Sequence, residues 1–125
     1  MDEAQIISAV IIPVLVEKDW NSHNLFGYKE ISHLEPKFAG VFLMGAGKII
    51  GVIKVEKPGS DLNLATQQAM RFAANLNVNS GYSNPKLIYA TDGADYVQLN
   101  METNTSEKII EIPTVWDLDW SELND

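Results

Sequence analysis

The stretch Gly51–Phe72, GVIKVEKPGSDLNLATQQAMRF, contains the clearest change from strand to helix in the chain. Its first part continues an Ile- and Val-rich run over 48–56, which favours a β-strand. Lys57-Pro58-Gly59-Ser60 then ends the strand, because proline and glycine interrupt regular structure. Ser60 or Asp61 can cap a helix over about 61–76 whose apolar residues share one face.

The sequence on either side of this stretch adds one helix and several strands. Apolar residues spaced four apart indicate a helix over 3–18, and Pro13 predicts a kink or local break within it. Residues 77–85 are expected to form a polar loop, and Asp92-Gly93 a turn. The strands are expected over 24–32, 38–44, 48–56, 86–91 and 95–101, with a short edge strand near 108–112. This order predicts an α/β (α+β) fold, a central mixed β-sheet flanked by helices.

The composition fits a folded domain and excludes several classes of protein. The chain has 125 residues, of which 46% are hydrophobic and 21% charged, so a single domain over 1–125 is expected. The lack of cysteine excludes disulfides, thiolate zinc sites and a cysteine nucleophile. No apolar run is as long as a membrane span, and the acidic start Asp2-Glu3 is unlike a secretory signal. We therefore expect a cytoplasmic protein without membrane contact.

The net charge of −8 comes entirely from the C-terminal part of the chain. Residues 1–90 carry eight acids and eight bases, whereas residues 91–125 carry nine acids and one base. The acidic segment over about 103–125 is expected to be a solvated end. Trp116 and Trp120 alternate with acids in this segment. They either form an interaction patch or fold back over a sheet edge.

Three short motifs along the chain carry a resemblance to a known family. In order they are Lys57-Pro58-Gly59, Gln68 and Thr91-Asp92-Gly93. The set resembles the nuclease domain at the N-terminus of type I restriction enzyme R subunits, in the PD-(D/E)xK, restriction-endonuclease-like superfamily. That family has an acid-x-lysine strand followed by Lys-Pro-Gly, a helix with Gln-x-x-x-Tyr, and a strand ending in Thr-Asn/Asp-Gly. The resemblance covers roughly residues 4–100 and implies a restriction-endonuclease-like fold.

The catalytic positions implied by the resemblance differ from the family pattern on two strands. The family aspartate, which precedes an apolar run, falls on Gly40 or on Ala39, and neither has a carboxylate. The acid-x-lysine falls on Lys54-Val55-Glu56, where the two charges are exchanged. A supporting glutamate of the family could correspond to Glu30 or Glu35.

The helix that follows these strands keeps part of its motif. Gln68 is retained, although a glutamine on a helix can also simply face water. Phe72 stands where the family has tyrosine, and we expect it to pack in the core.

The chemistry of phosphodiester hydrolysis shows why these differences matter. By this route the reaction needs Mg²⁺ held by at least two carboxylates, with a lysine beside the attacking water. Lys54 and Glu56 lie two residues apart on a strand, so their side chains share one face. With Gly40 this pair of strands offers one carboxylate. We expect an internal Lys54–Glu56 arrangement without a metal; the alternative is that both side chains face solvent.

Three functional hypotheses follow, and they leave enzymatic activity open. The favoured one is a catalytically degenerate, non-cleaving binding or regulatory module, related to restriction or mobile-element nucleases and needing no cofactor. The second is an active Mg²⁺-dependent DNA endonuclease, in which Glu30 and Glu56 hold the metal and Lys54 acts beside the water. The third is a DNA mimic or protein-interaction decoy that uses the acidic segment.

The expected partners follow from charge and from the predicted sheet edge. DNA, or a protein of a nuclease system, is the expected partner in the first two hypotheses. The neutral body permits weak DNA contact through Lys48, Lys54, Lys57 and Arg71. A homodimer is expected through the edge strand near 108–112.

Overall fold

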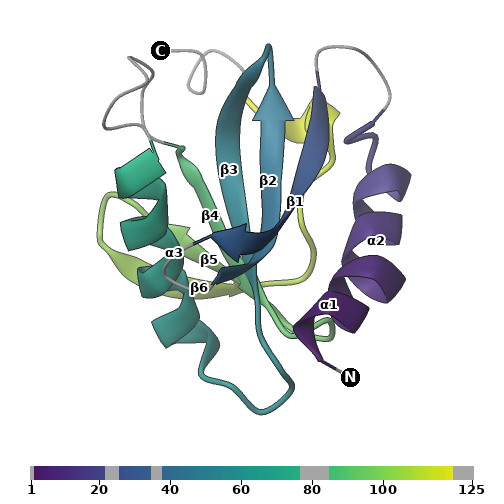
Figure 1. Ribbon diagram of the computed structural model, residues 1–125. Coiled ribbons are helices and arrows are strands. Elements are labelled where there is room, and N and C mark those ends of the chain that lie inside the picture. The colour runs from purple at the N-terminus through teal and green to yellow at the C-terminus, as the bar shows by residue number, and fades with distance from the viewer. Residues whose placement is uncertain (1, 22–25, 35–37, 77–84, 120–125) are drawn as a thin grey trace.

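The fold is a six-stranded mixed sheet with helices on both faces (Figure 1). The computed structural model describes residues 2–21, 26–34, 38–76 and 85–119. The helices are α1 (Glu3–Ile6), the π-helical η1 (Ile7–Ile11), α2 (Ile12–Glu17), α3 (Leu62–Leu76) and the 3₁₀ helix η2 (Val115–Asp117). The strands are β1 (Phe26–Leu34), β2 (Phe38–Gly45), β3 (Lys48–Val55), β4 (Leu87–Thr91), β5 (Tyr96–Asn100) and β6 (Thr105–Ile109). The expected fold class is confirmed.

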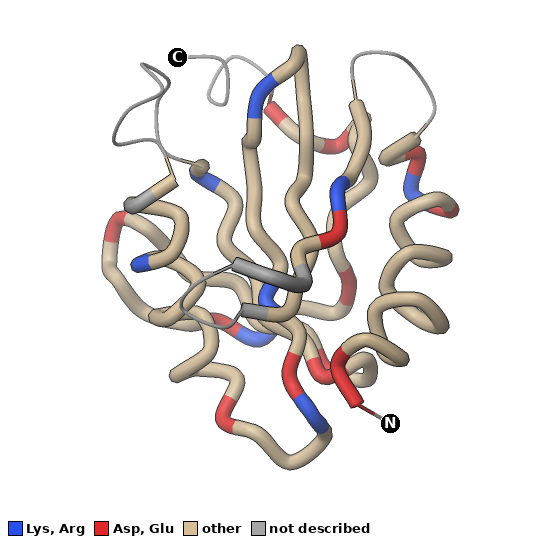
Figure 2. The backbone as a smooth tube through the Cα atoms, in the orientation of Figure 1, with Lys and Arg blue, Asp and Glu red and all other residues tan. Residues whose placement is uncertain are grey.

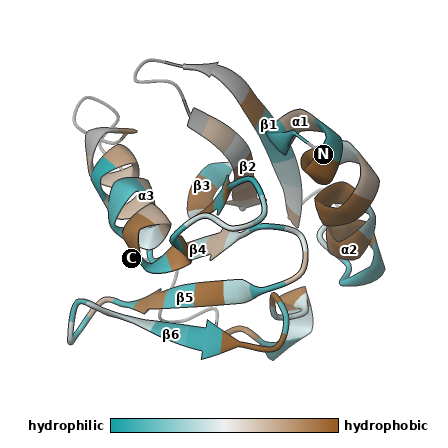
Figure 3. Ribbon diagram, turned by 90° about the horizontal axis from the view of Figure 1, so that it is seen from below, coloured by the Kyte–Doolittle hydropathy of each residue, from teal (hydrophilic) through white to brown (hydrophobic). Residues whose placement is uncertain are grey.

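The strands follow one another across the sheet in the order of the sequence. Neighbouring strands are antiparallel except for β3 and β4, which are parallel and joined through α3. The β2–β3 hairpin closes at Ala46 and Gly47, whose φ angles of 52° and 79° lie in the left-handed region. Seen end-on, α1 and α2 cover one face of the sheet and α3 covers the other (Figure 3). The predicted loop at 77–85 lies outside the described residues except for Pro85.

The N-terminal helical segment contains the local break that the sequence predicts. Its first turn is capped by Asp2, whose carboxylate accepts from the Gln5 backbone N–H at 2.8 Å. A π-helical turn then lies directly before Pro13, and the Ile12 N–H donates to the Ile7 carbonyl. Proline has no N–H, so it cannot continue the α-helical pattern, and the wider turn accommodates it.

Helix α3 packs the opposite face of the sheet. The Asp61 side chain accepts from the backbone N–H groups of Asn63 and Leu64, at 3.0 and 3.1 Å, which confirms the predicted N-cap. Phe72 is buried and stacks on Phe42 with ring centroids 6.0 Å apart, as expected of a core residue. This packing places α3 on the face of the sheet to which the Lys54 side chain of β3 projects.

The C-terminal part differs from the sequence-based expectation. The edge strand begins at Thr105 and ends at Ile109, so most of the expected range 108–112 follows the strand. The acidic segment is not simply a solvated end, because Ile112 and Val115 are 1% and 4% exposed and belong to the core under α1 and α2. Residues 110–112 leave the sheet edge because this burial outweighs further strand pairing.

Residues 111–118, which we call the C-terminal strap, return beside the end of α2 (Figure 1), and an ion pair and hydrogen bonds between described residues attach them there. Lys18 supplies two of them: its ammonium pairs with Glu111 at 2.9 Å, and its carbonyl accepts from Val115 N–H at 3.2 Å. The Trp20 indole donates to the Pro113 carbonyl at 3.1 Å, and the Trp116 indole donates to Asp19 at 2.9 Å. Part of the acidic segment is therefore structural. Among the described residues, no helix is long and apolar enough to cross a membrane.

Two isoleucines of this region provide a matched test of the strap. Replacing Ile112, which is 1% exposed, with alanine is expected to lower the free energy of unfolding by about 2–5 kcal/mol, because a buried side chain is lost. The same change at Ile110, which is 94% exposed, should alter it by no more than about 0.5 kcal/mol. Urea denaturation measures both. Equal effects would mean that the strap does not contribute to the core.

Candidate functional site

The candidate site lies where β2 and β3 pair near the end of β3. Gly40 is the direct antiparallel partner of Lys54, and Ile31 is the partner of Gly40 on the next strand. Residues directly opposite in a sheet project to the same face. Gly40 and Lys54 therefore share the face covered by α3, whereas Ala39 packs with the core on the other face. Of the two positions considered for the family aspartate, Gly40 is therefore the one on the same face as Lys54.

Lys54 and Glu56 form an ion pair within this site, as the sequence predicts from their spacing. Only 13% of the Lys54 side chain and 20% of the Glu56 side chain are exposed, so the alternative that both face solvent is wrong. Burial lowers the pKa of the Lys54 ammonium below its usual range, while the carboxylate of Glu3 opposes this effect. Glu56, which pairs with this lysine, directly follows the end of the same strand.

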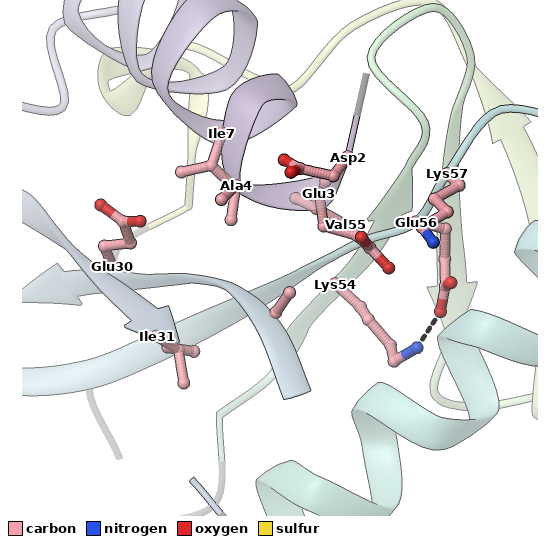
Figure 4. A pocket seen from close by; sticks show the side chains of 11 residues that line it. Asp2, Glu3, Ala4, Ile7, Glu30, Ile31, Lys54, Val55, Glu56 and Lys57 are labelled. Carbon is pink, nitrogen blue, oxygen red and sulfur yellow. Dashed lines mark hydrogen bonds and ion pairs between the residues drawn. The ribbon is translucent and has the colours of Figure 1, made fainter. Parts of the chain in front are cut away.

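Glu30 lies on the opposite face of the sheet from Lys54. Its partner on β2 is Val41, which belongs to the core under α1 and α2. Figure 4 shows Glu30 directed toward α1, whereas the Lys54 side chain extends to the other side and meets Glu56. Glu30 and Lys54, with its partner Glu56, therefore project from opposite faces of the sheet, although all three line the pocket at its end. The other candidate for this role, Glu35, lies outside the described residues.

A pocket of about 580 Å³ opens around this end of the sheet and contains residues that the sequence analysis missed (Figure 4). Asp2 and Glu3, from the first turn of α1, line it together with Glu30, Lys54 and Glu56. An acidic pair before a predicted helix was visible in the sequence. The sequence does not show that the first turn of α1 lies beside the end of β3 and lines the same pocket. The remaining lining residues are Ala4, Ile7, Ile31, Ala39, Val55 and Lys57.

Gln68 and the Thr91-Asp92-Gly93 turn lie outside the pocket. Gln68 is an exposed residue of α3 and does not line the pocket. In the Thr91-Asp92-Gly93 turn, the Asp92 carboxylate accepts from the N–H groups of Ala94 and Asp95, at 3.0 and 2.9 Å. These bonds outweigh partial burial and lower the pKa of Asp92. This is the turn chemistry that the sequence predicts.

The basic side chains proposed for DNA contact do not gather at one surface. Lys54 and Lys57 line the pocket, whereas Lys48 lies at the other end of β3 and Arg71 on α3. Figure 2 shows lysine and arginine positions spread over the chain. The pocket itself has four carboxylates and two lysines among its lining residues. Its charge is therefore unfavourable for a phosphate backbone.

The residues present do not fit a magnesium site of the kind that the resemblance implies. Within the described ranges, no group of three or more Asp, Glu, His or Cys side chains is placed to hold a metal ion. Position 40 supplies no side-chain oxygen, and the Glu56 carboxylate is engaged by the Lys54 ammonium. Mg²⁺ requires oxygen ligands, several of them from carboxylates or bound phosphates. We therefore derive no catalytic step through a metal.

Comparison with solved structures supports the fold. A fragment assigned to the HsdR subunit of a type I restriction enzyme from Vibrio vulnificus YJ016 superposes with a TM-score of 0.66 and 20% sequence identity. The match covers 91% of this chain but 24% of that chain, so this chain spans about a quarter of its length. No protein-family model and no curated protein matches the sequence. The chain thus has a fold related to that of a restriction enzyme subunit.

Removing the charge of Glu3 tests the electrostatics of the pocket. Because the Glu3 carboxylate raises the pKa of Lys54, Glu3→Gln is expected to lower that pKa further. Glu17→Gln removes an equal charge at the other end of the helical segment and should leave the Lys54 pKa unchanged. An NMR titration of the Lys54 side chain measures both. Equal shifts in the two variants would contradict a specific contribution from Glu3.

Proposed function

We propose that this chain is a restriction-endonuclease-like domain that does not cleave DNA and acts as a binding or regulatory module. One observation carries the proposal: Gly40 lies directly across from Lys54, and Lys54 is paired with Glu56. Where cleavage in this superfamily requires two carboxylates and a separate lysine, these positions hold one carboxylate already engaged by the lysine.

The placement of Glu30 supports the same proposal. An active endonuclease with a migrated carboxylate would need Glu30 and Glu56 to reach one metal ion. The register places Glu30 with Val41 on the face under α1, while Lys54 and Glu56 lie on the face under α3. This arrangement makes the active-enzyme alternative the weaker one. A binding role needs no metal ion and does not require Glu30 and Glu56 to reach the same point.

A protein of a nuclease system fits the pocket better than DNA does. Asp2, Glu3, Glu30 and Glu56 outnumber the two lysines of the pocket, so an approaching phosphate backbone would be repelled. DNA contact, if the domain makes any, would use Lys48 or Arg71 away from the pocket. We therefore place a protein partner first and direct DNA binding second.

Association of two copies stays a prediction, and the structure limits how β6 could take part. A symmetric antiparallel pairing places the central residue of the strand opposite itself. In β6 that residue is Glu107, and moving the centre by one residue brings Lys108 opposite itself. Like charges directly opposite destabilise a sheet. A register centred on Ser106 brings no like charges opposite each other, so the charges of β6 disfavour some registers of pairing with a second copy and leave others open.

The proposal is tested by incubating the protein with supercoiled plasmid and Mg²⁺ or Mn²⁺. We expect no nicked or linear product, because the site lacks the second carboxylate that a metal-activated water requires. Calorimetry should also detect no tight Mn²⁺ binding. Nicking that disappears in Glu56→Gln would overturn the proposal, since it would assign the activity to this site rather than to a contaminating nuclease.

Restoring the family order of charges gives a complementary test. Combining Gly40→Asp, Lys54→Glu and Glu56→Lys places two carboxylates directly opposite each other on β2 and β3, with a lysine two residues on. This triple variant is expected to bind Mn²⁺ where the natural protein does not. Calorimetry measures the binding, and thermal melting establishes that the variant is folded.

The matched control for the triple variant keeps the exchange at 54 and 56 and uses Gly40→Asn. Asparagine has almost the same shape as aspartate but no charge, so Mn²⁺ binding should be lost or much weaker. If the aspartate and asparagine variants bound Mn²⁺ equally, position 40 would not be the missing ligand position. A folded triple variant that binds no metal would contradict the assignment of the site.

A further inference from the structure

Trp116 is a large aromatic residue that the fold holds at the surface. It is 57% exposed, although the rest of the C-terminal strap includes the buried residues Ile112 and Val115. Its indole N–H donates to the Asp19 carboxylate at 2.9 Å, and its ring meets Phe26 edge-to-face with centroids 6.0 Å apart. The ring is therefore fixed in place before any partner arrives, which lowers the entropic cost of binding.

The residue that holds Trp116 is itself positioned by the end of α2. Asp19 has a φ of 67°, and its N–H donates to the Val16 carbonyl at 3.2 Å, while the Trp20 N–H donates to the Leu15 carbonyl at 3.0 Å. These two bonds form a helix-terminating motif whose left-handed position is usually glycine. Here an aspartate occupies it and directs a carboxylate to the indole. Asp19 thereby joins the helix end to the strap.

The surroundings of Trp116 are strongly acidic. Residues 16–19 and 111–119 contain five acids and one base, Lys18, which is already paired with Glu111. Of these acids, Glu17 and Asp117 are exposed. Figure 2 shows acidic positions at the end of α2, close to where the strap returns. Exposed Val16, at 40%, adds apolar surface at the same helix end.

We propose that Trp116 and its acidic surroundings form a docking surface for a basic, arginine-rich segment of a partner protein. A guanidinium group can stack on the face of a tryptophan and at the same time pair with neighbouring carboxylates. Exposed tryptophan and paired charges are common where a few residues supply most of the binding energy of an interface. The surface contains no residue of the pocket, so the inference does not rest on the proposed lack of cleavage.

Charge complementarity favours a basic protein segment over DNA and over a second copy of this chain. DNA carries the same sign of charge as the surface, so it would be repelled. A second copy of this chain would bring an equally acidic surface and a net charge of −8. A basic protein segment is attracted by the carboxylates and gains contact with the indole ring.

The experiment uses the full chain labelled with ¹⁵N and a blocked six-residue peptide of alternating arginine and glycine. Addition of the peptide is expected to shift the indole signal of Trp116 and leave that of buried Trp20 in place. The signal of Trp120 is assigned from the Trp120→Phe variant. A Trp116 signal that does not respond to the peptide overturns the proposal, as does one that responds to duplex DNA or to protein concentration alone.

Variants separate a specific surface from general attraction between opposite charges. Trp116→Ala should weaken peptide affinity by roughly two- to thirtyfold, the range expected for a cation–aromatic contact. Asp117→Asn should also weaken it, whereas Glu102→Gln, an equal loss of charge on another exposed residue, should leave it unchanged. Equal losses in Asp117→Asn and Glu102→Gln would overturn the proposal. The indole shift of the unaltered chain keeps the test valid if Trp116→Ala fails to fold.

Discussion

The alternation of side chains along β3 is the constraint on which the rest of the structure depends. β3 lies inside the sheet, antiparallel to β2 and parallel to β4, and both of its faces are covered. Ile53 and Val55 therefore pack under the N-terminal helices, whereas Val52 packs under α3. Lys54 follows the same alternation and must enter the side that contains α3. A one-residue change of register would exchange the two faces and expose the core.

Much of the fold is readable in the sequence because its signals are local. The breaker after β3, the cap at Asp61 and the glycine-containing turns all act over a few residues, and they appear where expected. The edge strand was misplaced because Ile109 to Ile112 look equally suited to a strand. Burial of Ile112 against the N-terminal helices, which are far away in the sequence, decides the outcome.

Some features of the candidate site follow from residues close together in the sequence, whereas others depend on contacts between distant segments. The pairing of Lys54 with Glu56 follows from a spacing of two on one strand, and so could be predicted. The separation of Glu30 from that pair depends on the register between β1 and β2, which the sequence does not reveal. The presence of Asp2 and Glu3 in the pocket depends on how α1 packs beside the end of β3. Both are consequences of tertiary packing.

The glycine at position 40 and the Lys54–Glu56 ion pair at the end of β3 form one coupled arrangement. A lysine buried to the extent of Lys54 needs a carboxylate nearby, since an uncompensated buried charge is costly. Position 40, directly across the hairpin, cannot supply one because it is glycine. Glu56 can, because it follows Lys54 by two residues and its ion pair closes on the same side. Glu56 is thereby engaged in an ion pair with a largely buried lysine, whose pKa is lowered by burial and raised by the Glu3 carboxylate. Changing either residue alone would remove this ion pair, so we expect a change from pairing to metal binding to involve positions 40, 54 and 56 together.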